Sequence, residues 1–239
     1  MTESRPTIGI LKCGHVAPSV AARHGTYTEW FRALLGPQGF DMPDWAVVDG
    51  DFPDSIDACD GWLVTGSPLG VYEDHAFIPP LMDFIRACRD AGKPVVGICF
   101  GHQAIAQALG GTVVKHEGGI KIGRQTYRVK GLGALTLNAW HQDQVVAPPP
   151  GAEILAEGPG CSVGAMAIGD TILTLQTHPE MTNACLLDLI ELRRDSGSFA
   201  PEQAALAEAG ATEAVDDKAA AAWIGDFYRQ GIGRRRDVA

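Results

Sequence analysis

Short β-rich runs alternate with longer stretches of helical spacing throughout the first 110 residues, and this alternation limits the chain to few architectures. The β-rich runs predict buried strands, whereas apolar residues that recur every three or four positions predict helices with one packed side. The predicted strands cover residues 7–11, 45–48, 61–65 and 95–98, and the predicted helices cover residues 27–35, 77–91 and 101–109. Such an alternation predicts an α/β fold with a mostly parallel central sheet flanked by helices.

Beyond residue 110 the pattern changes to β-rich pieces separated by glycine and proline. They predict an antiparallel section joined to the parallel sheet, and they cover residues 112–114, 123–129, 135–137, 153–156, 163–168 and 171–176. A helix is predicted over residues 181–194, and in the alanine-rich, acidic tail residues 219–228 favour a helix. We expect one domain over residues 1–195 and a helical extension of the same domain over residues 196–239.

Charge and cysteine content exclude several classes of function. Nineteen Lys and Arg against 29 Asp and Glu leave a net charge of −10, which would repel a phosphate backbone, so a nucleic-acid partner is not expected. No apolar run approaches the roughly 20 residues that a membrane helix needs, and residues 1–7 lack the layout of a secretory signal. Six scattered cysteines without a CxxC pair predict reduced thiols, and no histidine stands at metal-ligand spacing. We expect a cytoplasmic protein with no metal site and no membrane contact.

The strongest local signal is the segment Gly97-Ile98-Cys99-Phe100-Gly101, which lies between a predicted strand and a predicted helix. A nucleophile on a sharp strand-to-helix turn needs small neighbours, because its backbone is strained and side chains on either side would clash. The helix that follows would point its N-terminus at the sulfur and favour the reactive thiolate. The alternative is a buried apolar cysteine beside two incidental glycines.

A cysteine nucleophile needs a base, and the base needs an orienting group. The segment His178-Pro179-Glu180 supplies both directly after the predicted strand 171–176. Proline fixes the backbone between the two side chains, so the carboxylate can hold the imidazole as in other catalytic triads. Taken alone, this segment would be interpreted as a surface loop with a solvated histidine and glutamate.

Together these segments resemble the class I, or triad-type, glutamine amidotransferases, in which one strand ends in G-x-C-x-G-H-Q and a later strand ends in H-P-E. The first motif stands here at residues 97–103 and the second at residues 178–180, and the resemblance covers about residues 7–194. Two such motifs in one chain are far more specific than either alone. The resemblance implies a flavodoxin-like three-layer sandwich and is strongest to the amidotransferase domain of GMP synthase and its stand-alone relatives.

The same resemblance assigns an oxyanion hole. Residues 60–68 look like the family's strand and oxyanion loop, in which the turn after the strand directs a backbone N–H inward. By this likeness the N–H groups of Ser67 and Phe100 would face the developing oxyanion, and Gly66 would lie against the substrate. The alternative for this segment is a simple turn at the end of a strand.

A further segment, residues 140–145, is similar to the family's S-H-x-D-x-V sequence near the amino-acid end of bound glutamine. Asp143 or a neighbouring carbonyl would meet the α-ammonium group, although His141 and Asp143 could equally hold the loop together. Gln103 would help to hold the substrate or cap backbone groups. Trp140 departs from the family pattern, where a small residue is frequent, and so changes the expected substrate entrance.

These residues lead to a hypothesis of hydrolysis at the side-chain amide of glutamine or of a γ-glutamyl compound. The Cys99 thiolate attacks the δ-carbonyl, and His178, oriented by Glu180, protonates the leaving amine, so neither metal nor organic cofactor is needed. Glutamate is released from a γ-glutamyl thioester. The alternatives are a subunit that delivers ammonia to a separate synthetase chain and a non-catalytic binding protein on the same fold. A third alternative is a stress protein or peptidase that carries a cysteine on the same kind of sharp strand-to-helix turn. The oligomeric state is left open.

Overall fold

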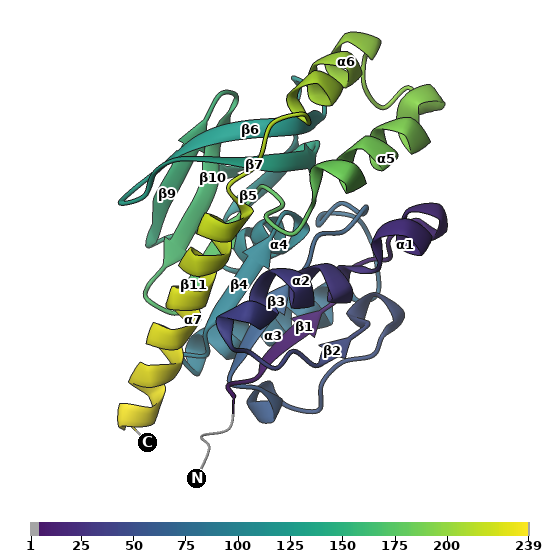
Figure 1. The fold of residues 1–239 in the computed structure, drawn as a ribbon. Coiled ribbons are helices and arrows are strands. Elements are labelled where there is room, and N and C mark those ends of the chain that lie inside the picture. The colour runs from purple at the N-terminus through teal and green to yellow at the C-terminus, as the bar shows by residue number, and fades with distance from the viewer. Residues whose placement is uncertain (1–4, 239) are drawn as a thin grey trace.

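A computed structural model describes residues 5–238, and Figure 1 shows its helices and strands. The strands are β1 (Ile8–Leu11), β2 (Asp44–Trp45), β3 (Gly61–Val64), β4 (Val95–Ile98), β5 (Thr112–Lys115), β6 (Lys121–Val129), β7 (Gly133–His141), β8 (Asp143–Ala147), β9 (Ala152–Gly158), β10 (Cys161–Ile168) and β11 (Ile172–Leu175). The helices are α1 (Pro18–His24), α2 (Tyr27–Leu35), α3 (Ile78–Asp90), α4 (Phe100–Ala108), α5 (Asn183–Arg193), α6 (Pro201–Gly210) and α7 (Asp217–Val238).

The main sheet has the strand order β2-β1-β3-β4-β11-β10-β9-β6-β7. Strands β2, β1, β3, β4 and β11 run parallel to one another, whereas β11, β10, β9, β6 and β7 pair antiparallel. A smaller antiparallel sheet joins β5 to β8. Parallel strands joined through helices and a later antiparallel section are the two parts that the sequence pattern predicts.

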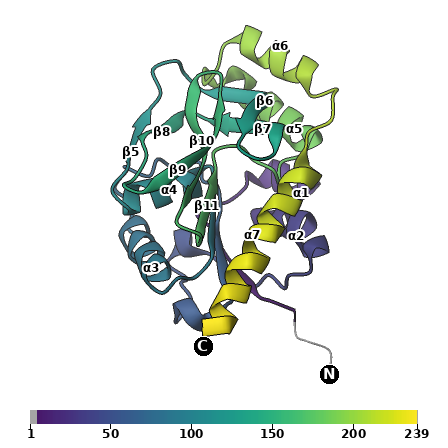
Figure 2. The same ribbon diagram turned by 90° about the vertical axis from the view of Figure 1, so that its left-hand side faces the viewer.

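Side chains alternate across the parallel strands and build a core on each face. Ile8, Val96 and Ile98 lie in the cluster that α2 and α7 cover, whereas Trp62 and Val95 lie in the cluster on the side of α3 and α4. Figure 2 shows the parallel strands between α3 on one side and α2 and α7 on the other. Both faces of these strands are buried, as their continuous apolar runs require, so helices must cover the sheet on each side and form the three layers.

Several elements differ from the expectations, among them β8, which stands where no strand was predicted. The strand predicted over residues 45–48 is shorter, because Val47–Asp49 forms a 3-10 turn that buries Val47 and ends at Gly50 with φ of +85°. The helix predicted over residues 219–228 extends over Asp217–Val238. Helices α1 and α6 stand where no element was predicted, and each has a proline at its first turn, where the missing N–H costs no hydrogen bond.

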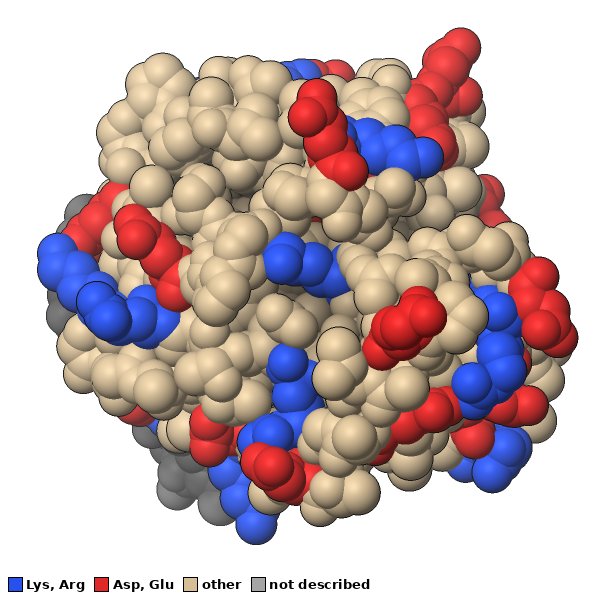
Figure 3. All heavy atoms as spheres, turned by 90° about the horizontal axis from the view of Figure 1, so that it is seen from above, with Lys and Arg blue, Asp and Glu red and all other residues tan. Residues whose placement is uncertain are grey.

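The carboxyl ends of the parallel strands meet at one edge of the sheet, which is where open α/β sheets bind ligands. Chain segments leave this edge directly after β3, β4 and β11. Seen from that end of the molecule, basic and acidic side chains are interspersed, and Lys and Arg side chains stand near the middle of the face (Figure 3). Within residues 5–238 no helix combines the length and the apolar character needed to cross a membrane.

Candidate active site

Cys99 lies on a strained turn between β4 and α4. Its φ of +52° and ψ of −101° make it the only non-glycine residue with positive φ among residues 5–238. The turn is held on both sides, because the N–H of Cys99 donates to the carbonyl of Leu175 at 2.8 Å and its own carbonyl accepts the N–H of Gln103 at 3.1 Å. Strain of this kind persists only where the surroundings enforce it, and it occurs most often at functional sites.

The two glycines of the turn are sterically required. A Cβ atom on Gly97 would lie 2.5 Å from the carbonyl oxygen of Gly101, and a Cβ atom on Gly101 would lie 2.2 Å from the carbonyl oxygen of Val64. Strand β3, strand β4 and helix α4 therefore approach one another as closely as backbone allows. This approach places the sulfur of Cys99 at the N-terminus of α4, where the helix dipole favours a thiolate.

His178 and Glu180 form a buried pair beside Cys99. The Nδ1 atom of His178 and the Oε1 atom of Glu180 are 2.7 Å apart, and both side chains are almost fully buried. Burial alone would lower the pKa of His178, but the negative charges of Cys99 and Glu180 and hydrogen bonds to both hold that pKa well above its ordinary value. Because Nδ1 bonds the carboxylate, Nε2 is left for the sulfur.

Asn138 on β7 anchors the loop that carries this pair. Its carbonyl accepts the N–H of His178 at 2.8 Å, and its side-chain amide donates to the carbonyl of Met181 at 2.9 Å and to Asn183 Oδ1 at 3.0 Å. Asn138 is fully buried, so these bonds replace contacts with water. Nothing in the local sequence marks this asparagine, because it follows a predicted strand some 40 residues before the histidine.

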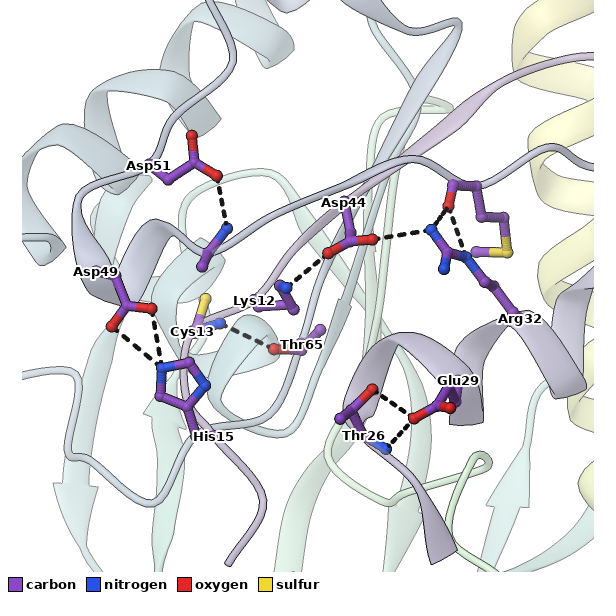
Figure 4. Close-up of polar contacts among 12 residues, drawn as sticks. Lys12, Cys13, His15, Thr26, Glu29, Arg32, Asp44, Asp49, Asp51 and Thr65 are labelled. Atoms are coloured by element: carbon purple, nitrogen blue, oxygen red, sulfur yellow. Dashed lines mark hydrogen bonds and ion pairs between the residues drawn. The ribbon is translucent and has the colours of Figure 1, made fainter. Parts of the chain in front are cut away.

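The loop after β3, where the sequence predicts an oxyanion hole, is held by the segment that follows β1. The hydroxyl of Thr65 accepts the N–H of Cys13 at 3.0 Å and donates to the carbonyl of Gly66 at 2.9 Å, and Figure 4 shows the bond between Cys13 and Thr65. The carbonyl of Thr65 accepts the N–H of Gly101 at 3.1 Å. Within the described chain, neither the N–H of Ser67 nor that of Phe100 donates a hydrogen bond.

Gly66 lies directly against the side chains of His178 and Cys99. A Cβ atom on Gly66 would lie 3.0 Å from Cε1 of His178 and 3.8 Å from Cβ of Cys99. The residues expected at the ends of β3, β4 and β11 are thus brought together in one place. The ring of Phe100 is buried and packs against that of Phe77, with 6.0 Å between the ring centroids.

A cavity of about 310 Å³, here called the first cavity, opens beside the sulfur of Cys99. Its wall contains Gln103, His141 and Asp143, all expected near the substrate. The side-chain amide of Gln103 donates to the carbonyl of Asp143 at 2.9 Å, and Nδ1 of His141 lies 3.1 Å from the same carbonyl. Both contacts hold the loop after β7 in place. Burial lowers the pKa of His141 to about 3, so its ring is neutral.

Tyr72 was not anticipated from the sequence and shapes the same wall. Its hydroxyl donates to Asp143 Oδ1 at 2.9 Å, and desolvation by burial raises the pKa of the Asp143 carboxyl. A larger hollow of about 960 Å³ over β6 and β9 contains none of the expected residues. Among residues 5–238, no group of three or more His, Cys, Asp or Glu side chains has an arrangement suited to a metal ion.

Comparisons with known proteins agree with this architecture. The family model described as Glutamine amidotransferase class-I matches residues 43–185. Gamma-glutamyl peptidase 4 from Arabidopsis thaliana is 33% identical over 183 residues, which cover 70% of this chain and 73% of that relative. A GMP synthase from Mycobacterium bovis is 40% identical over 128 residues, which cover 50% of this chain and only 23% of that relative.

Two solved structures share the fold. A glutamine amidotransferase from Methylobacillus flagellatus aligns with a TM-score of 0.73 at 21% identity and covers 96% of this chain and 94% of its own. Another from Thermotoga maritima gives a TM-score of 0.76 at 16% identity, covering 96% of this chain and 99% of its own. The expected α/β fold and the expected enzyme class are thereby confirmed. The chain belongs to the class I glutamine amidotransferase family.

Proposed function

We propose that this enzyme hydrolyses γ-glutamyl amide bonds through a thioester on Cys99. One observation carries the proposal: the strained Cys99 lies at the N-terminus of α4, and a Cβ atom on Gly66 would lie within 4 Å of both Cys99 and the ring of His178. His178 is buried and is itself paired to Glu180 at 2.7 Å. A nucleophile, a base and an orienting carboxylate in this order are the arrangement that acyl transfer requires. The polar first cavity beside the sulfur supplies space for the γ-glutamyl group.

In the first step the thiolate of Cys99 attacks the δ-carbonyl carbon, so that a carbon–sulfur bond forms. The raised pKa of His178 favours the imidazolium, which transfers its proton to the leaving nitrogen as the carbon–nitrogen bond breaks. The unused N–H groups of Ser67 and Phe100 are the available donors for the carbonyl oxygen as it gains negative charge. The products of this step are the free amine, or ammonia, and a γ-glutamyl thioester.

In the second step water attacks the thioester. Neutral His178 accepts a proton from the water, a carbon–oxygen bond forms and the carbon–sulfur bond breaks. Glutamate leaves, and the pair of thiolate and imidazolium is restored. Each turnover therefore consumes one amide and one water, and it uses no group beyond the side chains and backbone of this chain.

The likeness to gamma-glutamyl peptidase 4, which extends over 73% of that relative, favours a self-sufficient hydrolase. The 40% identity to part of a GMP synthase supports a second candidate, a subunit that passes ammonia to a separate synthetase. For either activity we propose a cytoplasmic location, because all six cysteines are unpaired and buried, as is usual in a reducing compartment.

The test is steady-state release of glutamate from glutamine and from γ-glutamyl peptides, with Cys99→Ala as the control. Rapid cleavage of peptides that needs Cys99 supports the hydrolase. Slow cleavage of glutamine alone, accelerated by an added synthetase, supports the subunit. Absence of glutamate release from every substrate contradicts both candidates and favours a binding protein. Mass spectrometry of quenched enzyme should detect an added γ-glutamyl group on Cys99 in the active protein.

A further inference from the structure

A second cavity, of about 110 Å³, lies next to the first. The two share four wall residues, Ser67, Pro68, Trp140 and Arg193. Trp140 is fixed between them, because its ring packs edge-on against Phe199 with 5.8 Å between the ring centroids. The tryptophan that departs from the family pattern therefore forms part of the wall where two separate spaces meet.

The nucleophile and its base face different cavities. Cys99 lines the first cavity and His178 lines the second. The acyl carbon must bond to the sulfur, whereas the leaving nitrogen must lie where the imidazole can protonate it. The γ-glutamyl group would therefore occupy the first cavity, and the leaving group would extend past His178 into the second.

The difference in polarity between the two cavity walls favours the same orientation of the substrate. Polar groups line the first cavity, among them Glu73, Gln103 and Asp143, which suit the charged end of a γ-glutamyl group. The second cavity is lined mostly by apolar and aromatic side chains, including Trp30, Met181 and Leu189. The reverse orientation would place the α-ammonium group in the second cavity, whose wall contains no carboxylate to pair with it, and this is costly.

The size of the second cavity limits what it can hold. A dry apolar cavity of about 150 Å³ accommodates benzene, so 110 Å³ suits a branched aliphatic side chain such as an isobutyl group. Ammonia, the leaving group from glutamine, would leave most of this space unused. An aliphatic leaving group would instead gain free energy from burial of its apolar surface.

Arg193 supplies a charge at the junction of the two cavities. It is the last residue of α5, one turn after Leu189, so both side chains lie on the same face of the helix. Arg193 lines both cavities, and its guanidinium makes no ion pair within the described residues. An exposed arginine in this position matches a free carboxylate, which it can bind through two parallel hydrogen bonds.

We propose that the second cavity is a leaving-group subsite for γ-glutamyl peptides whose second residue is a branched aliphatic amino acid with a free carboxylate. The apolar wall around Leu189 receives the aliphatic side chain, and Arg193 binds the carboxylate. This inference rests on the γ-glutamyl hydrolysis proposed above and specifies its substrate class.

Four substrates separate the contributions: glutamine, γ-glutamyl-glycine, γ-glutamyl-leucine and the γ-glutamyl isopentyl amide. The glycine peptide keeps the carboxylate without the side chain, and the isopentyl amide keeps the side chain without the carboxylate. In the unmodified enzyme we expect kcat/KM for γ-glutamyl-leucine to exceed that for γ-glutamyl-glycine by about tenfold or more, given the gain from burying a few methylene equivalents. We expect a ratio of about tenfold between γ-glutamyl-leucine and the isopentyl amide, which lacks the charge-assisted pair.

Two variants test which residue is responsible for each of these two ratios of kcat/KM. Leu189→Phe fills the second cavity and should reduce the leucine-to-glycine ratio about tenfold, whereas Leu187→Phe, on an exposed part of the same helix, should leave it unchanged. Arg193→Gln should reduce the ratio between γ-glutamyl-leucine and the isopentyl amide about tenfold. Arg194→Gln, which removes the next cation along the chain, is the matched control.

A leucine-to-glycine ratio near one in the unmodified enzyme would overturn the proposal. The proposal also fails if Leu189→Phe and Leu187→Phe alter that ratio equally, or if Arg193→Gln leaves the carboxylate preference intact. Loss of glutamate release from all four substrates in the unmodified enzyme is a different result, because it removes the hydrolysis on which the subsite depends. Circular dichroism of each variant separates misfolding from lost selectivity.

Discussion

Cys99 and its two glycines show how one residue can determine the conformation of several elements. The positive φ of Cys99 is tolerated because Gly97 and Gly101 let α4 and the neighbouring strands approach within backbone contact. A side chain at either glycine would push the helix away from the sheet and move the sulfur from the imidazole. The spacing of the G-x-C-x-G segment is therefore a steric requirement of the turn as well as a family motif.

Glu180 holds the imidazole of His178 and favours its charged form. Glu180→Gln keeps the size of the side chain but removes its charge, so the pKa of His178 should fall and the preferred tautomer should change. We expect kcat to decrease about 10²- to 10⁴-fold, by analogy with loss of the orienting carboxylate in other triads. The measurement is the pH profile of kcat/KM, in which the limb due to His178 should move to lower pH.

Glu202→Gln is the control for this substitution, because Glu202 is exposed in the first turn of α6. It should change neither the rate nor the profile. An unchanged pH profile in Glu180→Gln would show that the carboxylate does not set the charge of the histidine.

At the residue scale, short sequence patterns predicted those residues of the candidate site that are neighbours in the sequence. The turn around Cys99 and the segment 178–180 carry their own steric and chemical signals, and the structure places them together. Asn138, Tyr72 and Arg193 carry no such signal. Each reaches the site on an element brought there by tertiary packing, so its role depends on contacts that no short window of sequence contains.

At the scale of elements, β7, in the antiparallel part of the main sheet, holds the loop that carries His178. Asn138→Ala should leave the buried carbonyl of Met181 without its donor, at a cost of about 1–3 kcal/mol in the free energy of unfolding. Because the loop that carries His178 would loosen, we expect kcat to fall about tenfold or more. Urea unfolding and steady-state kinetics measure the two effects.

Thr136→Ala on the same strand is the matched control, since Thr136 bonds Thr126 rather than the loop. It should retain kcat. If Asn138→Ala lost stability but kept full kcat, the asparagine would support the fold without positioning the histidine.

Helix α7 shows how the tail relates to the rest of the chain. Ile224 and Tyr228 are fully buried in the core cluster of the sheet, and the hydroxyl of Tyr228 donates to the carbonyl of Trp62 at 2.8 Å. We therefore propose that residues 196–239 unfold together with residues 1–195. Ile224→Ala should lower the free energy of unfolding by about 2–5 kcal/mol, and Gln230→Ala, at an exposed position of the same helix, should change it little.

Thermal unfolding followed by circular dichroism and by tryptophan fluorescence checks this expectation. A single transition, shifted equally in both signals by Ile224→Ala, is the expected result. Two separate transitions would mean that α7 forms a unit of its own.

At the scale of the whole molecule, the sequence pattern predicted the layers but not the order of the strands. Short β-rich runs and helical spacing are local properties, so the mixed sheet between helices could be expected. The pairing of β4 with β11 joins segments more than 70 residues apart, and β6 pairs with both β7 and β9. Such pairings depend on long-range packing. Cys99 and His178 are likewise more than 70 residues apart in the sequence.

Two buried histidines make the stability of the molecule depend on pH. Burial lowers the pKa values of His102 and His141 to about 3, whereas in the unfolded chain each would titrate near its ordinary value of about 6.5. Between these values the unfolded state binds protons that the folded state does not. The free energy of unfolding should therefore fall as the pH falls below about 6.5, by up to about 1.4 kcal/mol per pH unit for each histidine.

His178 acts in the opposite sense but in another pH range. Its raised pKa contributes stability that is fully present below about 6.5 and is lost only as the pH rises through the raised value. Between pH 4.5 and 6.5, His178 therefore adds nothing to the pH dependence that urea unfolding measures, whereas His102 and His141 contribute to it. His141→Gln should remove about half of the slope, and His15→Gln, at an exposed position, should retain it. A flat dependence in this range would mean that the buried histidines accept protons in the folded state.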